Sequence, residues 1–129
     1  MKRTKLTALA SGLALLLIVT VFPASARGHA FPIRSEPRVG WKTAAPPAKV
    51  RIWFDGKLEP AFSTIAVYNS TRQRVDKGNG RVSPADATLL EVDLPPLPPG
   101  QYRVYWNVLA VDTHRTEGDF PFVVERESP

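Results

Sequence analysis

The 129-residue chain contains no cysteine, and its single methionine is Met1. The lack of cysteine excludes disulfides, cysteine-based zinc sites and thiol nucleophiles. Once Met1 is removed with a leader, no thioether remains, which excludes binding of a soft metal such as Cu(I) through sulfur. Histidine is also scarce, because the chain has only His29 and His114. A metal site in this protein therefore needs nitrogen and oxygen ligands.

The start of the chain has the composition of an export signal. Residues 1–5 are basic, residues 6–22 are almost entirely apolar, and a proline and small residues follow at 23–26. This order is typical of a cleaved secretory signal peptide. A membrane anchor is the alternative, but spanning takes roughly 20 apolar residues and this run is shorter. We therefore expect residues 1–28 to be a signal peptide, and no membrane insertion after its cleavage.

Removal of the leader also removes most of the net positive charge. The full chain carries 17 basic and 12 acidic residues, a net charge of +5. Cleavage after residue 28 leaves 13 basic and 12 acidic residues in a mature chain of 101. That length is enough for one domain with one core. No basic stripe remains to favour nucleic acid, so we expect a single domain, residues 29–129, with no nucleic-acid partner.

The mature sequence consists of short alternating segments separated by proline and glycine, as in strands and turns. No stretch after residue 30 keeps a helical period. We expect strands at 49–55, 62–69, 73–75, 88–94, 101–111 and 118–125. About seven short strands in about 100 residues predict an all-β Greek-key sandwich. The large aromatics on these strands are expected to fill its core; they are Trp53, Phe54, Phe62, Tyr102, Trp106, Phe120 and Phe122.

The triplet Asp112-Thr113-His114 follows the longest predicted strand. Residues i and i+2 of an extended strand point to the same side, so Asp112 and His114 can approach one ion while Thr113 faces away. A bulge or a strand end near Val111 would place both at the rim of the sandwich. The alternative is a solvated loop in which Asp112 caps a turn.

The role of His29 depends on where the leader is cut. Cleavage after Gly28 would give His29 a free α-amine beside its imidazole. Together with Asp112 and His114, it would then offer three nitrogens and an oxygen, a set suited to tetragonal Cu(II). Cleavage after Ala26 fits the small-residue rule better. It would leave an Arg27-Gly28-His29 terminus, which chelates Cu(II) without help from a folded domain.

The mature sequence resembles the CopC family of periplasmic copper-resistance and copper-carrier proteins. The similar stretches are residues 29–30, 35–37, 46–54, 100–107, 111–114 and 118–124. The resemblance implies an immunoglobulin-like, cupredoxin-like β-sandwich. It also implies one Cu(II) ion per domain, bound by the amine and imidazole of His29 and by Asp112 and His114.

Two features depart from the family pattern. Many relatives have serine where this chain has Ala110, so a hydrogen bond beside the ligands is expected to be missing. Some relatives hold Cu(I) through a methionine-rich segment, which this mature chain lacks. We expect a non-enzymatic, monomeric periplasmic protein that binds copper and sequesters or carries it in copper resistance or homeostasis. Its expected partner is an inner-membrane copper transporter.

Two other functions stay open on the sequence. A first-residue histidine beside a second imidazole also resembles the copper site of N-terminal-histidine oxidases and monooxygenases. Three nitrogens and a carboxylate, however, leave little open coordination for oxygen. The other alternative is a metal-free immunoglobulin-like interaction module. Hydrolysis by a Ser-His-Asp triad is not supported, because the sequence has no nucleophile elbow.

Overall fold

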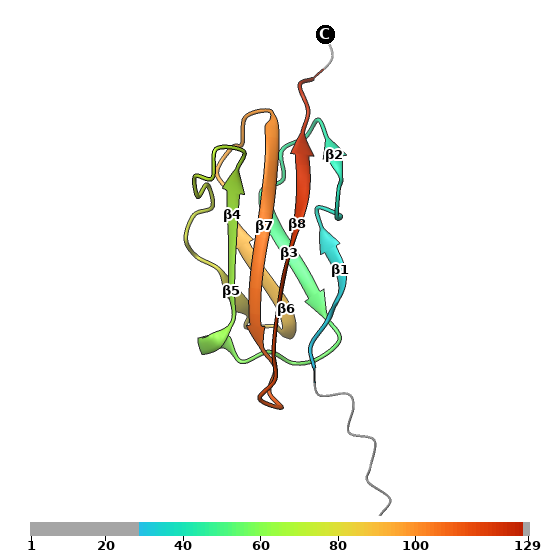
Figure 1. The fold of residues 1–129 in the computed structure, drawn as a ribbon, viewed down its shortest axis with the longest axis vertical. Coiled ribbons are helices and arrows are strands. Elements are labelled where there is room, and N and C mark those ends of the chain that lie inside the picture. The colour runs from blue at the N-terminus through green and yellow to red at the C-terminus, as the bar shows by residue number, and fades with distance from the viewer. Residues whose placement is uncertain (1–28, 128–129) are drawn as a thin grey trace, which may run out of the picture.

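Residues 29–127 of the computed structural model form a sandwich of two four-stranded sheets (Figure 1). The strand order is β1-β3-β6-β5 in one sheet and β2-β8-β7-β4 in the other. The strands are β1 (Pro32–Glu36), β2 (Lys42–Thr43), β3 (Lys49–Phe54), β4 (Thr64–Asn69), β5 (Arg81–Ser83), β6 (Asp86–Asp93), β7 (Gly100–Leu109) and β8 (Arg115–Val124). Within residues 29–127 the helical structure is limited to the 3₁₀ turn η1 (Pro60–Phe62). The predicted all-β sandwich is confirmed.

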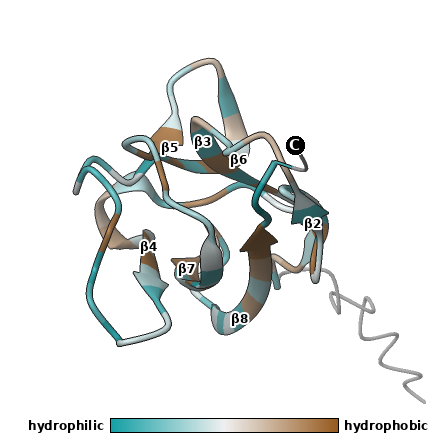
Figure 2. Cartoon of the chain, turned by 90° about the horizontal axis from the view of Figure 1, so that it is seen from above, coloured by the Kyte–Doolittle hydropathy of each residue, from teal (hydrophilic) through white to brown (hydrophobic). Residues whose placement is uncertain are grey.

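The core lies between the two layers, which Figure 2 shows from above. In β3, every second residue points inward, and Val50, Ile52 and Phe54 are at most 2% exposed. In β7 the same alternation buries Val104 and Val108. Burial of a side chain of this size contributes roughly 1.5–3 kcal/mol to folding. The period of two in the sequence is therefore what fixes the inner face of each sheet.

The aromatic residues divide between core and surface. Phe54, Tyr102, Phe120 and Phe122 are buried, as predicted, and Trp106 packs against the core while partly exposed. The prediction is wrong for Phe62, which is 57% exposed because it ends the η1 turn that precedes β4. It is also wrong for Trp53, which lies on the outer face of β3, where the Arg34 guanidinium stacks over its ring at 3.8 Å.

Three strands were not predicted, and one predicted strand is absent. β1 has no buried residue, and β2 and β5 have only two and three residues. Segments this exposed or this short leave no alternation to detect. The segment Gln73–Val75, predicted as a strand, makes one isolated bridge, between Arg74 and Tyr68. It lies beside the edge of β4, where the Val75 amide donates to the Val67 carbonyl at 2.9 Å.

The β7–β8 hairpin determines where the Asp112 triplet lies. The two strands pair in continuous antiparallel register from Gly100↔Val124 to Leu109↔Arg115. Their connecting loop therefore projects from one end of the sandwich, the end at which the described chain begins (Figure 1). The predicted signal peptide, residues 1–28, lies outside the described residues. In the described part of the chain, no helix has the length and apolar character needed to cross a membrane.

Candidate metal centre

The loop that carries Asp112 and His114 is a tight turn. β7 ends at Leu109, and the turn closes through hydrogen bonds from the Ala110 amide to the His114 carbonyl and from the Thr113 amide to the Ala110 carbonyl, both 2.9 Å. Thr113 has a φ of 79°, which is rare for a β-branched residue and indicates local strain. Of the arrangements that the sequence left open, the structure has a strand end near Val111, followed by an exposed turn in which Asp112 accepts a hydrogen bond from the His114 amide. Strand-like alternation through the triplet does not occur, because the chain reverses there.

A neighbouring segment holds the base of this turn. The Glu59 amide donates to the Leu109 carbonyl at 2.8 Å, and the Val111 amide donates to the Lys57 carbonyl at 3.1 Å. Between them, Leu58 and Ala110 form a β-bridge and are each 2% exposed. Ala110 thus packs as a core residue, and its main chain closes the turn. The turn is therefore fixed on both sides, by β8 and by residues 57–59.

Asp112 and His114 contact each other directly. One carboxylate oxygen of Asp112 accepts a hydrogen bond from the His114 amide at 3.1 Å, and the other lies 2.9 Å from His114 Nδ1. Partial burial alone would raise the pKa of Asp112. The hydrogen bonds from His114 and the nearby imidazoles outweigh that effect, so its pKa is lowered. Asp112 is therefore a carboxylate at neutral pH, and it orients the His114 ring.

The structure brings His29 to the same place. The His29 and His114 rings have centroids 4.3 Å apart with an interplanar angle of 62°. The His29 ring also lies 5.9 Å from that of Phe31. Both histidines are exposed, as expected for a site that an ion reaches from solvent. All three residues predicted to form a site, His29, Asp112 and His114, thus gather at one end of the sandwich.

The gathered side chains do not by themselves form a complete metal site. Among residues 29–127, no group of three or more His, Cys, Asp or Glu side chains is arranged to hold an ion. The two rings meet in edge contact, and Asp112 is already engaged with His114 Nδ1. The donor types nevertheless fit Cu(II), which takes imidazole nitrogen and carboxylate oxygen. A fourth donor would be the α-amine that cleavage before His29 creates.

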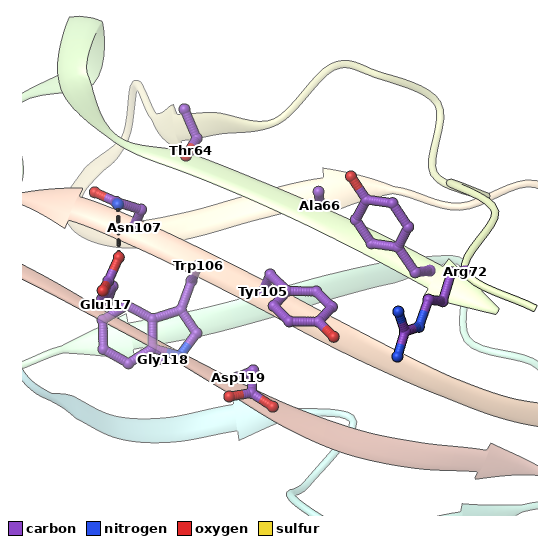
Figure 3. A pocket seen from close by; sticks show the side chains of 10 residues that line it. Thr64, Ala66, Arg72, Tyr105, Trp106, Asn107, Glu117, Gly118 and Asp119 are labelled. Carbon is purple, nitrogen blue, oxygen red and sulfur yellow. Dashed lines mark hydrogen bonds between the residues drawn. The ribbon is translucent and has the colours of Figure 1, made fainter. Parts of the chain in front are cut away.

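A depression of about 810 Å³ lies elsewhere, on the outer face of the β2-β8-β7-β4 sheet (Figure 3). Sequence reasoning missed it, because its lining comes from three strands, β4, β7 and β8, and from Arg72, which only the folded sheet brings together. The Tyr68 and Tyr105 rings meet there edge to face, with an interplanar angle of 87°. Arg103 pairs with Asp119 on the same face. Perpendicular rings do not form a flat stacking platform, and none of the three predicted site residues lines this depression.

Comparison with known proteins gives relatives of the whole domain. The copper transport protein CutJ of Bacillus subtilis is 32% identical over 85% of this chain, although the chain spans only 20% of the length of CutJ. The protein YobA of Escherichia coli K12 is 29% identical over 88% of this chain and 91% of YobA.

Solved structures show the same fold. CopC from Methylosinus trichosporium OB3b superposes with a TM-score of 0.69 at 33% identity, over 78% of this chain and 98% of that one. PcoC, a methionine-rich copper resistance protein from E. coli, superposes with a TM-score of 0.64 at 29% identity, over 75% and 99%. The CopC domain family model matches residues 33–125. Since this match covers well over half of the sequence, the chain belongs to the CopC family.

Proposed function

We propose that the mature protein is a periplasmic Cu(II)-binding protein of copper resistance or homeostasis, which holds one ion at His29, Asp112 and His114. The main support for this proposal is that the two histidine rings, which come from opposite ends of the domain sequence, lie with their centroids 4.3 Å apart. Copper is named as the cargo of one relative and in the name of a structural neighbour. The leader-like composition of residues 1–28 supports export.

The ligand chemistry follows from the atoms that are available. His29 would supply its α-amine and imidazole, His114 an imidazole, and Asp112 a carboxylate. Three nitrogens and one oxygen suit Cu(II), and no thiol or thioether in the mature sequence offers Cu(I) a softer alternative. The negative charge of Asp112, whose pKa is lowered, favours a cation at this position. These four donors are enough to coordinate one ion, so we expect one ion per domain in a monomeric protein.

Delivery to an inner-membrane copper transporter is the second part of the proposal. In CutJ, the region similar to this chain makes up one fifth of a longer protein that is named for copper transport. A domain that is fused to further sequence in one relative is a good candidate to work beside a separate partner in another organism. The exposed position of His29 and His114 leaves the site open to such a partner.

The decisive experiment is a calorimetric Cu(II) titration of the exported protein, after intact mass has shown that it begins at His29. We expect one Cu(II) per chain, and affinity reduced at least about tenfold by His114→Ala and by Asp112→Asn. Asp119→Asn is the matched control, because Asp119 lies on the outer face of β8 in a pair with Arg103. Unchanged binding in both site variants would refute the proposed site.

The same preparation separates a carrier from a copper enzyme. Copper-loaded protein is reduced in the presence of oxygen, and the hydrogen peroxide that forms is measured. If the protein is a carrier, the wild type should form no more peroxide than the His114→Ala variant with the same amount of copper. Peroxide formation that requires His29 and His114 would instead assign the site to an oxidase or monooxygenase.

A further inference from the structure

The residue that follows His29 is attached to β8. Ala30 is completely buried, and its carbonyl accepts a hydrogen bond of 2.7 Å from the Thr116 hydroxyl. Thr116 lies opposite Val108 in the β7–β8 register, two residues after His114. The hydrogen bond therefore joins the two halves of the proposed site by a short path. From His114 the path follows the main chain to Thr116 in β8. It then crosses the hydrogen bond from Thr116 to Ala30, which is the residue next to His29.

A second pair of hydrogen bonds fastens the next residue. The Phe31 amide donates to the Asp55 carboxylate at 2.7 Å, and the Asp55 amide donates to the Phe31 carbonyl at 2.9 Å. These contacts lie at the end of β3, just beyond Phe54. The first part of the described chain is thus held by both sheets, through Thr116 of one and Asp55 beside the other. We call Ala30, Phe31, Asp55 and Thr116 the N-terminal clasp.

The clasp explains how His29 reaches its position. His29 is exposed, and in the described part of the chain its ring is seen only against two other rings, those of Phe31 and His114. Ring contacts of this kind are weak, so they do not fix an end of a chain by themselves. The buried methyl of Ala30 and the hydrogen bonds of the Ala30 carbonyl and of Phe31 provide the rigid attachment.

We propose that Thr116 and Asp55 are positioning residues for the metal site: they hold the first residue of the mature chain so that its amine and imidazole converge with His114. This inference rests on the proposed copper function for its metal readout, but the attachment itself can be measured without metal. Neither residue offers a ligand to the ion in this scheme. Both act through the main chain of residues 30 and 31.

The test compares three threonine variants in protein processed to begin at His29. Thr116→Val keeps the shape of the side chain but leaves the buried Ala30 carbonyl without its donor. Thr116→Ser keeps the hydroxyl. Thr43→Val is the matched control, since Thr43 also donates to a main-chain carbonyl, that of Ala45, but lies in β2 next to the far end of β8. Asp55→Ala removes the second attachment, and it tests the same positioning role if Thr116→Val does not fold.

The first measurement is an NMR spectrum of the metal-free protein. We expect the nuclear Overhauser contact between the His29 and His114 rings to disappear in Thr116→Val and to persist in Thr116→Ser and Thr43→Val. The second readout is the Cu(II) dissociation constant with the electron paramagnetic resonance spectrum. Thr116→Val should weaken binding about 10- to 100-fold, a range typical of residues that orient ligands, and should broaden or split the copper spectrum.

The outcomes separate this inference from the proposed function. If Thr116→Val and Asp55→Ala keep both the ring contact and the wild-type copper spectrum, the positioning role is refuted and the copper site stands. If the wild-type protein binds no Cu(II) but Thr116→Val still loses the ring contact, the positioning role holds and the proposed function fails. Loss of affinity in Thr43→Val as well would show a general loss of stability and refute a specific role for Thr116.

Discussion

At the scale of single residues, the turn after β7 brings Asp112 and His114 together by a local reversal of the chain. The left-handed conformation of Thr113 lets the carboxylate of Asp112 reach both the amide and Nδ1 of His114. These contacts hold the two proposed ligands of the turn next to each other. The strain at Thr113 is therefore located where the proposed function needs a fixed imidazole.

Protons should compete with copper at this site. Imidazole and α-amine groups must be neutral to bind a metal ion, and in model peptides they titrate near ~6.5 and ~8. We expect the Cu(II) affinity of protein beginning at His29 to fall steeply below about pH 6, with the protein still folded. Titrations between pH 5 and 8, with circular dichroism at each pH, check this. A constant affinity across that range would contradict the proposed ligands.

A glycine in β8 makes room for the half-buried side chain of Trp106. Gly118 pairs with Trp106, and a Cβ atom at position 118 would lie 2.6 Å from Cζ2 of the indole. The indole cannot easily retreat, because it packs edge to face on Phe54 at 5.3 Å. We expect Gly118→Ala to lower the free energy of unfolding by about 1–3 kcal/mol, measured by urea denaturation.

Gly100→Ala is the control for that substitution. Its added Cβ would meet only the Tyr102 side chain, at an ordinary 3.9 Å. We expect this variant to be as stable as the wild type or slightly more so, since alanine restricts the unfolded chain. Equal destabilisation by both substitutions would show that the Trp106 contact is not the cause.

At the scale of elements, the free edge of β4 is covered by a short segment instead of a strand. The Asp76 carboxylate accepts hydrogen bonds from the Val67 amide in β4 at 2.8 Å and from the Gly78 amide at 2.7 Å, and it pairs with Arg74 at 2.9 Å. A side chain thus occupies a position that a strand of another molecule would otherwise fill. Covering an edge in this way protects a sheet from aggregation.

The stability that Asp76 provides should depend on pH. Burial alone would raise the pKa of Asp76, but hydrogen bonds from Arg74, Val67 and Gly78 lower it overall. The folded state therefore favours the carboxylate form. Its contribution is present above the ordinary carboxyl pKa near ~3.9 and is lost as the pH falls through the lower folded value.

Asp76→Asn tests this dependence in urea denaturation. At pH 7 we expect a loss of about 1–3 kcal/mol in the free energy of unfolding, because a buried, charged acceptor is removed. The difference from wild type should shrink as the pH is lowered below about 4. Asp119→Asn, which breaks a largely exposed pair, should cost at most about 1 kcal/mol. A difference that is the same at pH 7 and at pH 3 would rule out this role for the carboxylate.

The elements that the sequence pattern predicted correctly are those with one buried face. β3, β4, β6, β7 and β8 all lie within the expected ranges or begin a few residues from them, because alternation records burial. β1 has no buried residue and therefore shows no alternation, although it leads from the His29 end into the sandwich. The segment 73–75 has strand-like residues and makes an isolated bridge to β4, but the Val67 amide donates to the Asp76 carboxylate instead of to a further main-chain carbonyl.

At the scale of the whole molecule, copper binding should be coupled to folding only for one of the two leader cuts. A protein that begins at His29 needs the folded sandwich to add His114 and Asp112. We expect its melting temperature to rise with Cu(II), since a ligand that binds only the folded state stabilises it. A protein that begins at Arg27 chelates copper at its terminus in both states, so its melting temperature should rise less.

Scanning calorimetry of both forms, with and without one equivalent of Cu(II), measures this difference. The His114→Ala variant of the shorter form is the matched control and should lose most of the rise. An equal rise in both forms would mean that the position of the first residue does not decide how copper is held.

Periodicity predicted the all-β fold class of this protein, composition showed that it has no cysteine, and the two histidines together with the resemblance to the CopC family named its three candidate metal-binding residues. These follow from local properties: alternation reports which face is buried, and two histidines leave few choices. Only the tertiary structure decided that the His29 and His114 rings meet, with their centroids 4.3 Å apart. That proximity depends on the β7–β8 register and on the attachment of Ala30 to Thr116, contacts between residues far apart in the sequence that no local pattern encodes.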